Sequence, residues 1–245
     1  MLYNPDKQNF LNDNIQYLFD KIIYEYDMQH AGLSIIKEFN LLSDKKIREL
    51  ELMSKDMAHI TVGKIQRDDK TFSKLLTDKF AIIRSRFIRD NSLEDNDIIA
   101  VKKDAFFVTK LCNTDQFGEV KFIVKNKYTS YIRFTDNHNI ECYYHDRGID
   151  IKGLSDSSEN KHRLYMIEFL KNYFKYMENR DSSVKRFLLK FIYDYKAMKL
   201  DEGFYLEFNS KSYDINPMYN YYKLIIPLFQ IVLEENIWRI QHMYI

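Results

Sequence analysis

The pattern of apolar and polar residues predicts that β-strands and helices are mixed along the chain. A β pattern predicts strands at residues 21–27, 97–101, 105–110, 117–124, 129–134 and 139–144. Apolar residues three and four positions apart predict helices at 31–40, 46–52, 71–90, 163–177, 182–200 and 217–237. Residues 9–18 fit either a short helix or a strand, and a short strand is expected near 204–208. The pattern predicts an α+β fold whose C-terminal part is mostly helical.

Serine residues mark two helix starts in the first half of the chain. Ser43 is predicted to cap the helix at 46–52, and Ser54 to begin another helix that carries Met57, Ile60 and Ile65. The helix at 71–90 has the clearest pattern, with apolar residues at Phe72, Leu75, Leu76, Phe80, Ile83 and Phe87.

The strands at 97–101 and 105–110 predict a hairpin with Asp104 at its tip. From that tip the Asp104 carboxylate could reach the strand that holds Asp27. Two carboxylates on adjacent strands, together with substrate phosphates, can hold two Mg²⁺ ions for phosphoryl transfer. The alternative interpretation is that Asp27 ends a strand and Asp104 turns a hairpin.

The segment that begins at Asp27 carries a further pattern. Residues 27–36 read D-M-Q-H-A-G-L-S-I-I. They resemble motif A of the family B DNA polymerases, D-x-x-S-L-Y-P-S-I-I, with Asp27, Ser34, Ile35 and Ile36 in register.

Three later segments resemble motifs of the same family in the same order. Residues 101–107 resemble a degenerate motif C, G-D-T-D-S-I-F. Asp104 stands at the position of the second, metal-binding Asp, and Lys102 stands at the position of the first Asp. Residues 125–128, K-N-K-Y, resemble the K-K-x-Y segment that contacts primer and template, and residues 147–153 resemble the G-(I/V)-D-x-K-G stretch. The resemblance covers residues 20–155 and implies a polymerase-like palm, an antiparallel sheet with helices.

The departures from the family pattern limit what the resemblance implies. The family's Tyr, which excludes a 2′-hydroxyl, is Gly32 here, so poor discrimination against ribonucleotides is expected. His30 and Leu33 replace the family's Ser and Pro, and no K-x-x-x-N-S-x-Y-G motif B lies between the two aspartates. The residues before motif A are too few for an exonuclease domain, and proofreading is not expected.

The basic residues of the helix at 71–90 are candidates for binding the triphosphate. In a polymerase, cations on a fingers helix neutralise phosphate charge, and Lys79 and Arg86 lie nearest the edges of the apolar face. Together with Gly32 they form the predicted nucleotide-binding set. A basic face in contact with solvent is the alternative.

A second basic cluster, with aromatic residues, follows the predicted strands after residue 120. Lys125, Lys127 and Arg133 are expected to follow a phosphate backbone, with Tyr128 supporting a sugar or base. An edge strand protected by lysines would have the same pattern.

Composition and length bound the organisation of the chain. The 245 residues suffice for one large or two small domains, and we expect a palm-like region at 1–155, with short helical fingers at 31–92, and a helical thumb-like region at 156–245. The net charge of +1 gives no overall attraction to nucleic acid.

Other classes of protein have little support in the sequence. The six histidines lack zinc-site spacing, and no serine hydrolase, P-loop or dinucleotide-binding motif occurs. The two cysteines fit buried thiols in a reducing cytoplasm, and no apolar run is long enough to span a membrane. The composition, with few Gly and Pro, is typical of an AT-rich genome such as that of a phage or a low-GC bacterium. If a phage encodes the protein, it would act in the host cytoplasm.

Two hypotheses of different classes follow. The first is a phage-type template-directed nucleotidyl transferase, in which Asp27 and Asp104 bind Mg²⁺ or Mn²⁺ and the partners are nucleoside triphosphates and a DNA or RNA primer-template. The second is a catalytically inactive palm that serves as a binding module, or as a subunit of a phage replication or transcription complex with other proteins. The sequence leaves open whether the protein is an enzyme.

Overall fold

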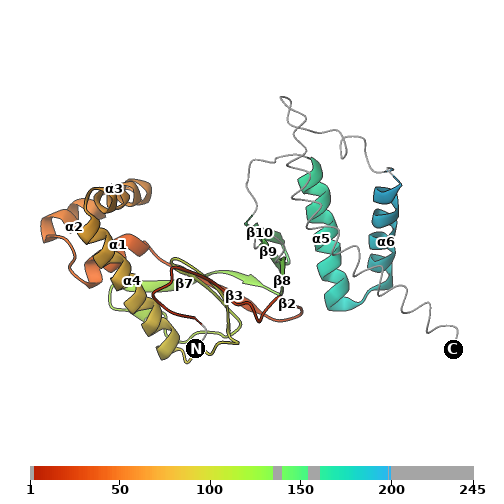
Figure 1. Ribbon diagram of the computed structural model, residues 1–245, viewed down its shortest axis with the longest axis horizontal. Helices are drawn as coiled ribbons and strands as arrows, with labels where there is room; N and C mark the ends of the chain where they lie inside the picture. The colour runs from red at the N-terminus through yellow and green to blue at the C-terminus, as the bar shows by residue number, and fades with distance from the viewer. Residues whose placement is uncertain (1–2, 135–139, 154–160, 198, 200–245) are drawn as a thin grey trace. The chain divides into compact units, whose positions relative to one another are not determined.

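The computed structural model describes residues 3–134, 140–153, 161–197 and 199, in two compact units (Figure 1). The first unit comprises Met1–Ile15 and Lys21–Tyr128, and the second comprises Gln16–Asp20 and Thr129–Ile245. Strands and helices are mixed and every strand pairing is antiparallel, which confirms the α+β class. The longer segment of the second unit begins at Thr129, whereas the sequence suggested a division after residue 155.

The first unit contains a six-stranded sheet with strand order β1-β4-β5-β3-β7-β6. Its strands are β1 (Asn9–Leu11), β3 (Ile23–Met28), β4 (Ile98–Lys102), β5 (Ala105–Val108), β6 (Gln116–Phe117) and β7 (Val120–Tyr128). The predicted hairpin is therefore formed by β4 and β5. It lies directly beside β3, the strand that carries Asp27.

Four helices of the first unit separate β3 from the hairpin in the sequence. They are α1 (Ala31–Glu38), α2 (Asp44–Glu51), α3 (Lys55–Asp68) and α4 (Lys70–Asp90). The side chains of Ser43 and Ser54 accept hydrogen bonds from the backbone amides of Lys46 and Met57, so both predicted N-caps are confirmed. Asp69 caps α4 in the same way, through the amide of Phe72.

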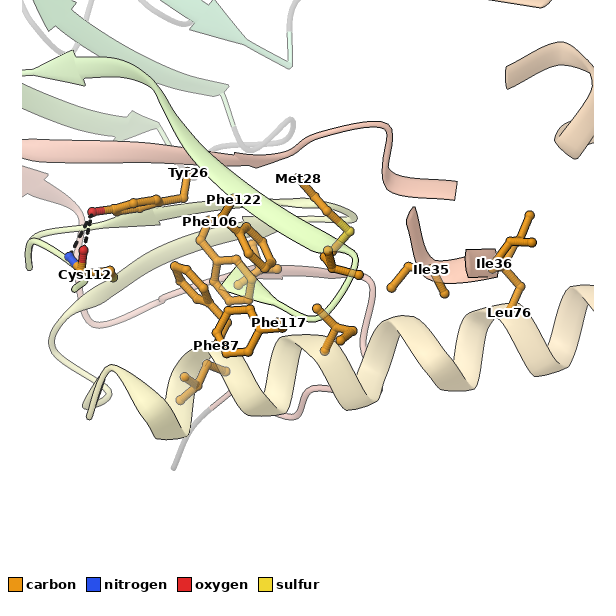
Figure 2. Close-up of a cluster of buried hydrophobic side chains, with 14 of the residues drawn as sticks. Tyr26, Met28, Ile35, Ile36, Leu76, Phe87, Phe106, Cys112, Phe117 and Phe122 are labelled. Atoms are coloured by element: carbon orange, nitrogen blue, oxygen red, sulfur yellow. Dashed lines mark hydrogen bonds between the residues drawn. The ribbon is translucent and has the colours of Figure 1, made fainter. Parts of the chain in front are cut away.

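The core of the first unit lies between α4 and one face of the sheet. Figure 2 shows Phe87 of α4 among aromatic side chains of the strands. Its ring centroid lies 4.4 Å from that of Phe122, 4.7 Å from that of Phe106 and 5.4 Å from that of Tyr26. The Tyr26 hydroxyl accepts a hydrogen bond of 2.8 Å from the amide of Cys112, which satisfies the polar end of a buried ring (Figure 2). This packing fixes the face of β3 that bears Tyr26.

Small residues form much of the inward face of α3. Of the apolar residues that the sequence placed on this helix, Ile65 packs against the core, whereas the side chains of Met57 and Ile60 are 54% and 63% exposed. Ala58 and Val62 are buried instead. These smaller residues let α3 lie close to α1, where a Cβ on Gly32 would lie 3.3 Å from Cγ1 of Val62.

The second unit packs a four-stranded sheet against two helices. The strands β2 (Tyr17–Leu18), β8 (Ser130–Phe134), β9 (Ile140–His145) and β10 (Gly148–Lys152) have the order β10-β9-β8-β2. The helices are α5 (Lys161–Asn179) and α6 (Ser182–Lys196). Phe169, Tyr173 and Phe174 of α5 are buried in its core, as expected for an aromatic stripe.

Two predicted elements lie outside the described residues, namely the strand near 204–208 and the helix at 217–237. Within the described part of the chain, no helix combines the length and the apolar character needed to cross a membrane.

Candidate functional site

The fold brings Asp27 and Asp104 side by side. Strand β3 pairs with β5 so that Asp27 lies opposite Ala105, and the amide of Met28 donates a hydrogen bond of 3.0 Å to the carbonyl of Asp104. The hairpin tip therefore reaches the strand of the first aspartate, as the sequence predicted. The role of the two carboxylates as metal ligands stays a prediction.

The environment of Asp104 raises its pKa. Burial is the largest cause, and the neighbouring Asp27 carboxylate adds to it, while a backbone hydrogen bond, Lys103 and Lys125 act in the opposite direction. Two carboxylates held together at the cost of burial and repulsion form a site that a divalent cation would stabilise. The oxygen atoms fit Mg²⁺, which prefers oxygen ligands and keeps several waters.

The acidic site is small. Within the described residues, no group of three or more His, Cys, Asp and Glu side chains is placed to hold a metal ion. Any ion between Asp27 and Asp104 would take its remaining ligands from water or from the oxygens of a bound substrate.

Lys125 contacts the acidic site directly. Its Nζ lies 3.6 Å from Oδ2 of Asp27 and 3.9 Å from Oε1 of Glu25. In the β3–β7 pairing, Glu25 lies opposite Asn126 and Tyr26 lies opposite Val124, so Lys125 is the extra residue of a β-bulge. The bulge turns Lys125 toward the face that carries Glu25 and Asp27, opposite to the face of Tyr26.

Within the first unit, Lys127 and Tyr128 do not join Lys125 at the acidic site. Lys127 pairs with Tyr24 and places its Nζ 5.7 Å from the centre of that ring, so the prediction that Lys125 and Lys127 share a face is wrong. The bulge is the physical reason, because it breaks the alternation of side chains along β7. Tyr128 is fully buried and donates a hydrogen bond of 2.7 Å to Glu25, which does not fit stacking on a base. Arg133 belongs to the second unit.

A cavity of about 600 Å³ opens beside the two aspartates. Asp27 and Asp104 are among its lining residues, the start of α1 contributes His30 and Gly32, and α3 and α4 supply most of the remaining wall. That wall includes Ala58, His59, Val62, Leu76, Phe80 and Arg84. The cavity is therefore lined by acidic, basic and apolar groups, and Asp56 of α3 is among the acidic ones. Gly32 is a lining residue, and its role in nucleotide binding stays a prediction.

Lys79 and Arg86 do not line this cavity, contrary to the predicted triphosphate role. Nζ of Lys79 lies 4.9 Å from the centre of the Phe39 ring, and the Arg86 guanidinium contacts the same ring and lies 3.5 Å from Oε1 of Glu38. Both cations are directed toward the C-terminal end of α1. They fit the alternative interpretation, a basic surface that contacts its neighbours.

Two residues of the site were not singled out from the sequence. Glu25 is two positions before Asp27 on a strand, and that spacing places both carboxylates on one face. Arg84 is 1% exposed and lines the cavity. Its burial could have been inferred from the sequence, because it lies four residues after Phe80 and three before Phe87, on the apolar face of α4.

The described chain is thus a two-unit α+β protein with a pair of carboxylates beside a cavity. A family model for the Bacteriophage PBS1 gene 130 protein matches residues 1–236, and the chain belongs to this family. The match supports the phage origin expected from the composition. No curated protein matches the chain.

Proposed function

We propose that the protein is a template-directed nucleotidyl transferase whose active site is formed by Asp27 and Asp104. The observation that carries the proposal is the register of β3 against the β4–β5 hairpin, which sets the two aspartates side by side at the cavity. The resemblance to polymerase motifs A and C implies that Asp27 and Asp104, although far apart in the chain, lie close together in space. A palm with helical fingers formed by α1 to α4 is the architecture that we infer.

The residues at the cavity suit the metal binding and nucleotide binding that such a reaction needs. Mg²⁺ or Mn²⁺ held by Asp27 and Asp104 would activate the attacking hydroxyl and neutralise charge on the leaving group. The cavity volume of about 600 Å³ suits a nucleoside triphosphate, since small-molecule sites usually measure about 300–1,000 Å³. The apolar side chains of α3 and α4 would face the nucleoside, and the primer end of a DNA or RNA duplex would approach the carboxylates.

Gly32 shapes the expected choice of sugar. It lines the cavity, and Val62 occupies the space into which a larger side chain at this position would project. Because residue 32 presents no side chain to a 2′-hydroxyl, we expect that ribonucleotides and deoxyribonucleotides are both used.

Primer extension on a short primed template with Mg²⁺ or Mn²⁺ tests the proposal. Asp27→Asn and Asp104→Asn should each abolish incorporation, with an unchanged circular dichroism spectrum. Asp90→Asn is the matched control, because this carboxylate lies at the end of α4 and binds Arg89. Incorporation that survives both site substitutions would exclude the assignment, and use of ribonucleotides would support the inference from Gly32.

A second candidate function is a palm that binds nucleic acid or protein subunits without catalysis. The observation that favours it is the ammonium of Lys125, which lies beside Asp27 where a metal ion would otherwise bind. In this case the protein would bind a primer-template in EDTA as well as in Mg²⁺, and no nucleotide would be incorporated. Metal-dependent turnover would exclude it.

A further inference from the structure

Arg84 is a buried cation at the base of the hairpin tip. It is 1% exposed, and burial lowers its pKa. A buried guanidinium is costly unless its donors are bound, so the groups that it binds indicate why it is there. Nε and Nη1 have partners, whereas Nη2 is buried without a hydrogen-bond partner among the described residues.

Its hydrogen bonds join two segments that are far apart in the sequence. Nε donates to the carbonyl of Pro5 at 2.8 Å, and Nη1 donates to the carbonyl of Lys103 at 3.2 Å. Lys103 is the residue directly before Asp104. Arg84 therefore bridges the N-terminal segment and the turn that carries a candidate metal ligand.

The same turn is held at two further points of its backbone. The amide of Lys103 donates to the carbonyl of Gln8 at 2.6 Å, and the carbonyl of Asp104 accepts from the amide of Met28 at 3.0 Å. Helix α4, the N-terminal segment and β3 thus each bind the backbone of this two-residue turn.

The turn needs such support for two reasons. Lys103 has a φ angle of 51°, a left-handed conformation that costs free energy in a residue with a side chain. Asp104 is also held against the like charge of Asp27, which acts to push the tip away from β3.

We propose that Arg84 is a positioning residue that clamps the Lys103–Asp104 turn between the N-terminal segment and α4, and so keeps Asp104 beside Asp27 for a divalent cation. This inference rests on the proposed function. In this role Arg84 acts through the backbone carbonyls of Pro5 and Lys103, although its side chain also lines the cavity.

Binding of Mn²⁺ to the full-length protein, followed by the electron paramagnetic resonance signal of the free ion, tests the clamp. Arg84→Lys keeps the charge, but one ammonium cannot reproduce the fork that spans two carbonyls. Its affinity for Mn²⁺ should fall about 10-fold, as for other groups that orient metal ligands. In an Asp104→Asn background the same substitution should have no further effect, because the ligand that it positions is gone.

A milder variant covers the case in which Arg84→Lys does not fold. The Tyr3 hydroxyl donates to the carbonyl of Lys7 at 3.0 Å, while its ring packs against Phe10 and Phe106. Tyr3→Phe keeps the ring but removes a hydroxyl that interacts with both the N-terminal segment and Arg84, so it weakens the clamp at two points. Hydrogen exchange at the amide of Lys103 should become faster, and affinity for Mn²⁺ should fall about 2- to 3-fold. Arg89→Lys, at an exposed residue of the same helix, should change neither quantity.

The outcomes separate this inference from the proposed function. Binding of Mn²⁺ that requires Asp104 but is unchanged in Arg84→Lys and in Tyr3→Phe would overturn the clamp and leave the metal site intact. If Arg84→Lys lowered the affinity for Mn²⁺ equally in the Asp104→Asn background, its role would be a general structural one. That result would also overturn the clamp. No binding of Mn²⁺ by the unmodified protein would overturn both proposals.

Discussion

The ammonium of Lys125 lies 3.6 Å from the carboxylate of Asp27, at the point where a divalent cation is proposed to bind. The β-bulge in β7 is what places it there. A lysine so close to a metal ligand competes with the metal, because it satisfies part of the negative charge that would attract the ion.

Removing this lysine should tighten the binding of Mn²⁺. We expect about a 3- to 10-fold gain in affinity for Lys125→Ala, a moderate effect because the lysine side chain is 52% exposed and its charge is screened by solvent. Titration with Mn²⁺ measures the gain. Lys127→Ala is the matched control, since that lysine contacts Tyr24 on the other face, and an equal gain in both variants would point to net charge alone.

Asp104→Asn should stabilise the fold near neutral pH. The folded state raises the pKa of Asp104 through burial and the charge of Asp27, so the ionised carboxylate costs stability at neutral pH. This cost is absent below the ordinary pKa of an aspartate, about 4, grows as the pH rises from there to the raised value, and is constant above the raised value. Thermal unfolding should show a gain in Tm of about 1–3 °C at pH 7.5 that shrinks on acidification. A gain that does not depend on pH would contradict this explanation.

Glu25→Gln should destabilise the first unit. The buried Glu25 carboxylate accepts hydrogen bonds from Asn126 at 2.6 Å and from Tyr128 at 2.7 Å, and Lys125 lies 3.9 Å from it. A glutamine side chain has only one oxygen acceptor, and its NH₂ group would face the donors of Asn126 and Tyr128. We therefore expect a loss of about 1–3 kcal/mol in the free energy of unfolding. Urea denaturation measures it. Glu119→Gln, which breaks an exposed ion pair with Lys37, should cost less than about 1 kcal/mol.

Two glycines that line the cavity should respond differently to alanine. Gly63 lies within α3 with no atom near its missing Cβ, so Gly63→Ala should stabilise the protein by about 0.5–1 kcal/mol. A Cβ on Gly32 would press on Val62, so Gly32→Ala should give little or no gain. Adding Val62→Ala to Gly32→Ala relieves that contact, and a double-mutant cycle should show positive coupling. Additive effects would mean that the contact is unimportant.

The sequence predicted those parts of the fold that depend on local pattern. The strands on either side of Asp104 are short apolar runs that flank a short polar turn, so the β4–β5 hairpin and the position of its tip could be inferred. The helix starts at Ser43 and Ser54 could be inferred because their side chains bind amides three residues away. The position of Asp104 at a hairpin tip and that of Asp27 on a strand could both be inferred from the sequence.

The remainder of the site depends on contacts that a local pattern does not contain. The bulge at Lys125 changes which side chains share a face, and its cause is a pairing with β3, about a hundred residues earlier. Lys79 and Arg86 of α4 both contact the ring of Phe39. That contact depends on how α1 packs against α4, which a local pattern does not contain. In α3, the apolar Met57 and Ile60 are exposed because the smaller Ala58 and Val62 allow the closer approach to α1.

Strand β2 gives the chain an order of assembly. Tyr17 and Leu18 pair with Ile132 and Tyr131, yet the residues between them form most of the first unit. During synthesis, β2 leaves the ribosome long before β8 exists, so the second sheet gains this edge only after the chain has returned from the first unit. The chain also passes between the units three times, near Ile15, near Asp20 and near Tyr128. A single proteolytic cut at any of these points would leave the two units covalently joined, or held by the β2–β8 pairing.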